Sequence, residues 1–181
     1  MKGIWDYYDF IAAVDPGLSH TGATGVIVLT ERGILDGFLV RGKKGEGYAE
    51  RLARMKRDLF ADLYRIIGRD LRVLFSVEMN HATENRSADS ALRQFGLIGA
   101  LIAQAHEQEY DVVEVRPSQG KKALTGNGWA DKDEDMVPAA EAFAGWRPEW
   151  SRFKYSRQAL ADALGAAIAG AEKVLQGADS K

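Results

Sequence analysis

The sequence predicts a mixed α/β domain in which helices flank a central sheet. Three strand-like segments follow one another near the start, at residues 11–15, 23–30 and 33–41. Two further strand-like segments, at residues 71–78 and 111–115, alternate with segments of helical period. We therefore expect a sheet built from a three-strand meander followed by two further strands.

The meander is indicated by turn residues between short apolar segments. The first strand ends in the sequence Asp15-Pro16-Gly17, and such a Pro-Gly pair is typical of a turn. The second strand, ATGVIVLT, is rich in β-branched residues, which favour extended backbone. Only the polar pair Glu31-Arg32 separates it from the third strand, as expected for neighbours in a meander.

The helices are predicted from apolar residues that recur at helical spacing. Residues 48–66 show this period with charged residues on the other faces, which indicates an amphipathic helix. Residues 87–108 are apolar or small on almost every side, so this helix needs cover on two sides. Two further helical segments, 132–144 and 156–175, enclose an irregular stretch at residues 145–155.

The length and the absence of repeats predict one domain. The chain has 181 residues, which fits a single compact domain with its own core. No low-complexity tract or linker divides it. We expect the domain to span residues 1–175 and residues 176–181 to form a disordered tail.

The composition excludes several kinds of chemistry. The chain has no cysteine, so it has no disulfide, no thiolate metal site and no cysteine nucleophile. The start carries Asp6 and Asp9 within its apolar run, unlike a signal peptide, and no uncharged segment is long enough to span a membrane. We expect a soluble, cytoplasmic protein without membrane contact. A net charge of −2 does not by itself indicate nucleic-acid binding, although the sum can hide a basic face opposite an acidic pocket.

Three acidic residues stand where one edge of the sheet would gather them. Asp15 and Glu78 each end a predicted strand, and Asp162 lies on a small-sided face of the last predicted helix. Singly, they have ordinary explanations as a turn former, a solvated strand end and an exposed helix acid. Together, converging carboxylates persist only where cations neutralise them. Carboxylate oxygens are ligands that Mg²⁺ and Mn²⁺ prefer.

Four motifs in order give the chain a family resemblance. They are DPGLSHTG at residues 15–22, NRSADSAL at 85–92, RPSQGKKALTGNGWADK at 116–132 and QALADALGAAIA at 158–169. The chain resembles the RuvC family of Holliday junction resolvases, which belongs to the RNase H-like superfamily. The resemblance spans nearly the whole chain and implies an RNase H-like sheet.

The resemblance also implies roles for individual residues. Asp15, Glu78 and Asp162 match the family's metal-binding acids, and Lys121 and Lys132 match its two basic active-site residues. It implies two Mg²⁺ ions per site, with Mn²⁺ as a possible substitute, and metal-dependent resolution of four-way junctions by a homodimer through paired, symmetric nicks. It places the enzyme with the nucleoid of a bacterium or phage-infected cell.

One departure concerns the metal site. The family usually carries a fourth ligand one helical turn before its last acid, and Ala159 stands there in this chain. Three carboxylates can still hold two ions, and the neighbouring Gln158 is a weak candidate substitute.

Further residues are candidates for contact with DNA. Arg41, Lys43 and Lys44 form a basic turn, and Lys122 adjoins an active-site lysine. The resemblance places His81 where the family has an aromatic that stacks on an unpaired base. The stretch from residue 146 to residue 155 interleaves aromatic and basic residues, which suits either a DNA-facing loop or a cap on the core.

Three other functions remain open at this point. The first is an RNase H-like nuclease that cuts other branched DNA or RNA–DNA hybrids. The second is a phosphate-binding ATPase of the actin and sugar-kinase type, although such proteins need two domains and a longer chain. The third is a DNA-binding module without catalysis, which Ala159 makes conceivable.

Overall fold

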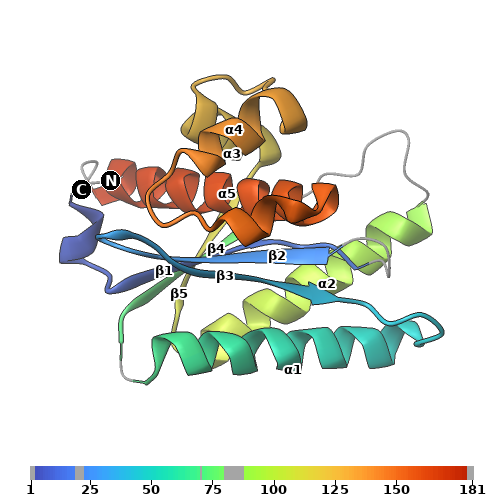
Figure 1. Ribbon diagram of the computed structural model, residues 1–181. Helices are drawn as coiled ribbons and strands as arrows, with labels where there is room; N and C mark the ends of the chain where they lie inside the picture. Colours follow the sequence, from blue (N-terminus) through green and yellow to red (C-terminus); the bar gives the residue numbers. More distant parts are fainter. Residues whose placement is uncertain (1–2, 19–22, 70, 80–87, 179–181) are drawn as a thin grey trace.

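A five-stranded sheet lies at the centre of the computed structural model of the chain, which describes residues 3–18, 23–69, 71–79 and 88–178. The strand order is β3-β2-β1-β4-β5. The strands are β1 (Phe10–Asp15), β2 (Ala23–Thr30), β3 (Gly33–Arg41), β4 (Val73–Glu78) and β5 (Asp111–Val115). Figure 1 shows helices on both faces, with α3, α4 and α5 on one side and α1 and α2 on the other.

The helical elements differ widely in length. The α-helices are α1 (Tyr48–Ile67), α2 (Ala88–Glu107), α3 (Pro117–Thr125), α4 (Val137–Glu141) and α5 (Lys154–Ala178). Shorter turns of other helical types are η1 (Ile4–Asp6), η2 (Lys132–Met136) and η3 (Pro148–Arg152), of which η2 is π-helical. Figure 1 shows α5 running along the sheet with α3 and α4 above it.

The strand pairing brings the ends of β1 and β4 to one edge of the sheet. β1, β2 and β3 pair antiparallel, as predicted for a meander. β4 pairs parallel with both β1 and β5. Parallel neighbours have their carboxyl ends on the same side, so the last residues of β1 and β4 are neighbours.

Each face of the sheet has its own apolar core, as the alternation of side chains requires. Ile11 and Ala13 of β1 pack in the cluster that contains α5. Ala12 and Val14 pack in the cluster that contains α1 and α2. The side chain of the next residue, Asp15, therefore belongs to the α5 face.

Helix α5 is buried on all sides along its central turns, from Ala159 to Ala171. Small residues allow this, because a Cβ atom added at Gly25 of β2 would lie 2.3 Å from the Ala159 carbonyl oxygen. A Cβ added at Gly165 would lie 2.8 Å from the carbonyl oxygen of Gly120 in α3. The backbones of β2 and α3 thus approach α5 as closely as glycine permits.

Helix α3, which begins at Pro117, is not among the predicted elements, because a proline after a strand-like segment is typical of a strand end. Proline is also suited to the first turn of a helix, where an amide hydrogen would have no partner. The Gln119 side chain accepts a hydrogen bond from the Arg116 amide at 2.9 Å and so caps this turn.

Two predicted helix boundaries were also wrong. The helix expected at residues 132–144 is η2 followed by the short α4, since Pro138 has no amide hydrogen to continue an α-helix. Helix α5 continues to Ala178, so residues 176–178, expected in a disordered tail, are helical. Val174 and Leu175 pack against the core and anchor this last part of the helix.

The sequence predicts that no segment is long and apolar enough to span a membrane. Within residues 3–18, 23–69, 71–79 and 88–178, no helix is both long and apolar enough to cross a bilayer.

Candidate metal centre

Asp15 and Glu78 are the last residues of two neighbouring parallel strands. The register pairs Val14 of β1 with Val77 of β4, so the two acids follow side by side. Two residues before Glu78, the Ser76 hydroxyl donates a hydrogen bond to the Ala166 carbonyl of α5 at 2.7 Å. Because side chains alternate along a strand, Glu78 lies on the same α5 face as Asp15.

Helix α5 supplies Asp162 above this pair of strand ends. Gly25 is the cross-strand partner of Asp15, and α5 touches Gly25 at Ala159. Asp162 follows three residues later and is 3% exposed, while Glu78 is 5% exposed. The fold therefore buries two carboxylates on facing elements beside a third.

The negative charges of this group act on one another. Burial is the main cause that raises the pKa of Glu78 well above its usual value, and the charges of Asp15 and Asp162 raise it further. Burial also raises the pKa of Asp162, and Lys132 opposes that shift. Such mutual perturbation means that the three acids share one electrostatic environment.

Both predicted lysines lie in the same environment. Lys132, the first residue of η2, forms an ion pair with Asp162. Burial acts to lower the pKa of Lys132, but the charges of Asp162 and Asp15 outweigh it and raise the pKa. Lys121 of α3 donates a hydrogen bond to the Ala130 carbonyl at 2.6 Å, and its charge acts to lower the pKa of Glu78.

The carboxylates and lysines described above suit a cation, although the acids do not form a closed three-ligand site. Among the residues that the structure describes, no three His, Cys, Asp or Glu side chains lie close enough together to hold one ion. Mg²⁺ usually takes only one or two protein carboxylates and completes its shell with water and phosphate oxygens. Buried carboxylates of raised pKa, compensated by ammonium groups, are the donor set that such an ion would neutralise.

Ala159, where the resemblance leads us to expect a fourth ligand, lies beside these strand ends. Ala159 faces Gly25, the strand partner of Asp15. The side-chain amide of the neighbouring Gln158 donates a hydrogen bond to Asp133 at 2.8 Å. Gly25 itself was overlooked in the sequence, although a glycine inside a β-branched strand indicates close approach of another backbone.

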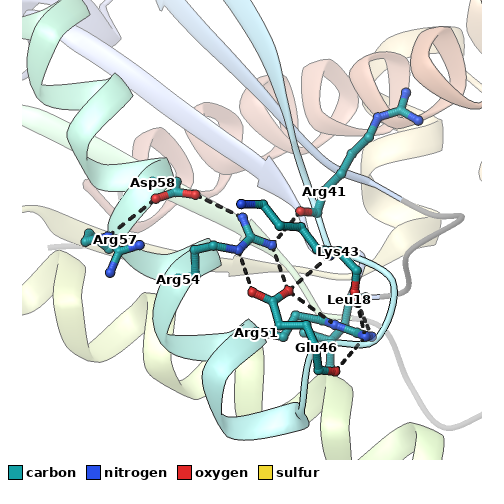
Figure 2. Close-up of polar contacts among 8 residues, drawn as sticks. All are labelled: Leu18, Arg41, Lys43, Glu46, Arg51, Arg54, Arg57 and Asp58. Carbon is teal, nitrogen blue, oxygen red and sulfur yellow. Dashed lines mark hydrogen bonds and ion pairs between the residues drawn. The ribbon is translucent and has the colours of Figure 1, made fainter.

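The basic turn after β3 is built on a network of ion pairs, which Figure 2 shows. Glu46 accepts from Arg54 at 2.6 Å, and Arg54 also donates to the Arg41 carbonyl at 2.8 Å. Arg51 donates to the Lys43 carbonyl at 3.1 Å, which fixes the backbone of the turn. The Lys43 and Lys44 residues are exposed.

The side chain of Arg41 connects this turn with α5. Its guanidinium donates to the Ser156 hydroxyl at 2.9 Å, and Ser156 precedes Asp162 by six residues on α5. The structure thus brings the Arg41 side of the turn close to the helix that carries one of the candidate acids.

Lys122, one of the remaining candidates, lies away from Asp162. Lys122 is exposed on α3 and lines a shallow groove with Glu172 and Lys173, toward the far end of α5 from Asp162. His81 lies outside the described residues.

Part of the aromatic stretch before α5 caps the core, which is one of the two roles expected for it. Trp146 and Trp150 pack edge to face with ring centroids 5.4 Å apart and lie against the core. Arg147 forms an ion pair with Asp36 at 3.2 Å. Phe153, by contrast, is exposed at the start of α5.

Comparison with known proteins identifies the relatives of this fold and site. The family model described as crossover junction endodeoxyribonuclease RuvC matches residues 11–139. A crossover junction endodeoxyribonuclease RuvC of Nitratidesulfovibrio vulgaris is 32% identical over 164 residues, which cover 87% of each chain. The chain belongs to the RuvC family.

Solved structures of RuvC from Thermus thermophilus share the fold. One is 26% identical, with a TM-score of 0.70 over 93% of this chain and 96% of the other. A second, described as RuvC in complex with Holliday junction substrate, gives a TM-score of 0.72 over 94% of this chain and 97% of the other. The RuvC resemblance and the RNase H-like α/β fold predicted from the sequence are therefore confirmed.

Proposed function

We propose that this RuvC-family chain is a metal-dependent endonuclease that resolves four-way DNA junctions by paired, symmetric nicks. The observation that carries the proposal is the meeting of Asp15, Glu78 and Asp162 at one sheet edge, beside Lys121 and Lys132. A relative of the same fold is described as bound to a Holliday junction substrate. A junction substrate would place the protein with the nucleoid.

The three carboxylates would hold two Mg²⁺ ions, or Mn²⁺ in their place. Ions so held supply an activated water for attack on the phosphodiester and stabilise the oxygen that leaves. Asp15 and Glu78 are suited to the role because rigid neighbouring strands hold them, and Asp162 because a buried helix does. Rigid placement of this kind keeps catalytic groups in their working geometry.

The two lysines would position the scissile phosphate. Lys132 is the ion-pair partner of Asp162, so its ammonium lies where a phosphate oxygen would meet the carboxylates. Lys121 lies on α3 and donates a hydrogen bond to the Ala130 carbonyl, in the loop after that helix, at 2.6 Å. We assign both to charge neutralisation and placement of the strand to be cut.

Paired nicking requires two such sites, and we assign them to a homodimer. A four-way junction offers two symmetry-related phosphates, which a two-fold dimer matches. Helix α2 exposes Leu92 and Phe95 on successive turns, and these give the dimer an apolar contact surface.

Cleavage of synthetic DNA tests the proposal. With Mg²⁺ or Mn²⁺, we expect symmetric nicks in a mobile four-way junction and much slower cutting of flaps, duplexes and RNA–DNA hybrids. Asp15→Asn should lower the cleavage rate by at least about a hundredfold, since removing a catalytic electrostatic group typically costs that much. Glu31→Gln, an exposed acid at the opposite end of β2, is the matched control.

The outcomes separate the alternatives. Metal-dependent nicking that survives in Asp15→Asn would show that the acid is wrongly assigned. Equal cutting of hybrids and junctions would favour a nuclease of broader specificity. A wild type that binds the junction and never cuts would favour a DNA-binding module.

A further inference from the structure

Trp129 is the most exposed large apolar side chain among the residues that the structure describes, at 93%. It lies in the loop at residues 126–131, which joins α3 to η2. An indole offers a large flat surface at low conformational cost and is typical of binding sites. Full exposure of this ring therefore points to a partner that covers it.

The loop holds the tryptophan backbone in one conformation. The Asn127 side chain accepts a hydrogen bond from the Trp129 amide at 3.0 Å, and the Thr125 hydroxyl accepts one from the Asn127 amide at 3.1 Å. The next residue, Ala130, is fully buried and donates its amide to the Asn127 carbonyl at 3.2 Å. A fixed loop that turns an indole outward is prepared for contact and pays little entropy on binding.

The position of the loop connects Trp129 to the candidate metal centre. Lys121 donates to the carbonyl of Ala130, the residue next to Trp129, at 2.6 Å. Lys132 follows three residues after Trp129 and pairs with Asp162. Both lysines that flank the carboxylates thus contact this short loop or follow it directly, so Trp129 lies within a few residues of both points of attachment.

We propose that the Trp129 ring stacks on a nucleobase at the junction crossover and so positions the strand that is cut. The inference rests on the proposed function, because it takes the phosphate of that strand to lie at the carboxylates. Bases at a crossover or a splayed strand have accessible π-faces, and aromatic stacking on them tolerates any sequence. The lysines would bind the backbone while the indole binds the base.

Binding measurements in EDTA test the contact without cleavage. Labelled four-way junction is titrated with wild type, Trp129→Ala and Trp129→Phe at one fixed salt concentration. We expect Trp129→Ala to raise Kd roughly 5- to 150-fold, the range measured for loss of one stacked base. Trp129→Phe keeps a stacking ring and should stay within about threefold of wild type.

Two controls distinguish stacking from a structural role. Tyr7→Ala removes another exposed aromatic, 53% exposed and placed before β1 at the opposite end of the sheet from Asp15, and should leave Kd unchanged. A junction with abasic sites at the crossover should bind wild type as weakly as Trp129→Ala binds the intact junction. Junction DNA should also quench the tryptophan emission of wild type, and Trp129→Phe should lose that quenching.

Each result decides for or against the contact. If wild type cuts the junction and Trp129→Ala binds it as tightly as wild type, stacking is wrong and the proposed function stands. If sedimentation shows that Trp129→Ala turns a dimer into a monomer, the ring packs on a second copy and stacking is wrong. If affinity depends on Trp129 but wild type never cuts, the contact stands and the proposed cleavage is wrong.

Discussion

Burial of carboxylates at one edge of the sheet lowers the stability of the fold, and Glu78 and Asp162 are buried in this way. Burial raises the pKa of both groups, so the fold resists their ionised forms. The structure offsets this partly with Lys132, whose ammonium pairs with Asp162. Divalent cations would offset it more completely, because each supplies two charges to the same few oxygens. Sites that carry this kind of strain are typical of function rather than of stability.

A carboxylate at residue 159 should strengthen metal binding. Ala159 lies against Gly25, the strand partner of Asp15, so Ala159→Asp adds an oxygen donor to the candidate site. We expect the Mg²⁺ concentration for half-maximal cleavage to fall about tenfold, since affinity rises with the number of charged ligands. Titration of cleavage rate and calorimetric titration of Mg²⁺ without DNA both measure this.

The charge of the new ligand, rather than its size, carries that prediction. Ala159→Asn has nearly the same volume and no charge, so it should leave the Mg²⁺ requirement close to that of wild type. Without metal, Ala159→Asp should also unfold at lower temperature than Ala159→Asn, because another buried anion repels those present. Equal Mg²⁺ requirements for the two variants would place residue 159 outside the metal site.

At the scale of elements, the β3–α1 turn owes its shape to ion pairs rather than to an apolar core. Glu46 binds Arg54, and Arg54 and Arg51 donate to backbone carbonyls of the turn (Figure 2). The turn thereby presents Lys43 and Lys44 to solvent in a fixed conformation. A prearranged pair of ammonium groups of this kind suits a DNA backbone, which binds through charge rather than sequence.

The stability of this turn should depend on acid pH. Hydrogen bonding from Arg54 is the main cause that lowers the pKa of Glu46 from 4.5 to about 2. A lowered pKa in the folded state stabilises the protein above pH 4.5, and this contribution is lost as pH falls from 4.5 toward 2. Glu46→Gln should therefore be less stable than wild type at pH 7, with a difference that shrinks below pH 4.5.

Urea unfolding at several pH values between 7 and 3 measures that difference. Glu50→Gln, an exposed glutamate in the first turn of α1, is the control and should follow wild type. A Glu46→Gln deficit that stays constant across the pH range would mean that packing, not charge, holds the turn.

For the whole molecule, local patterns predicted the sheet and the three candidate acids at one edge of it. Asp15 and Glu78 could be placed together because both end strands, and alternation then sets their shared face. The approach of Asp162 depends on the contact of Gly25 with Ala159, and a glycine in a strand indicates close approach of a backbone without showing which element approaches. The sequence shows Lys121, Trp129 and Lys132 in order, but the predicted elements did not include α3, on which Lys121 lies. The exposure of Trp129 depends on tertiary packing, which the local sequence does not indicate.

The assembly of two copies gives the last prediction. Leu92 and Phe95 are 69% and 41% exposed and lie three residues apart on α2, so they form one apolar face. Leu92→Glu places a charge in that face and should weaken self-association by roughly tenfold or more.

On a cruciform plasmid at low protein concentration, wild type should give linear product, and Leu92→Glu should give mainly single nicks. Leu71→Glu changes another exposed leucine, 41% exposed and placed before β4, and should cut like wild type. Paired cleavage by a monomeric Leu92→Glu protein in sedimentation would show that another surface, or a single copy, performs resolution.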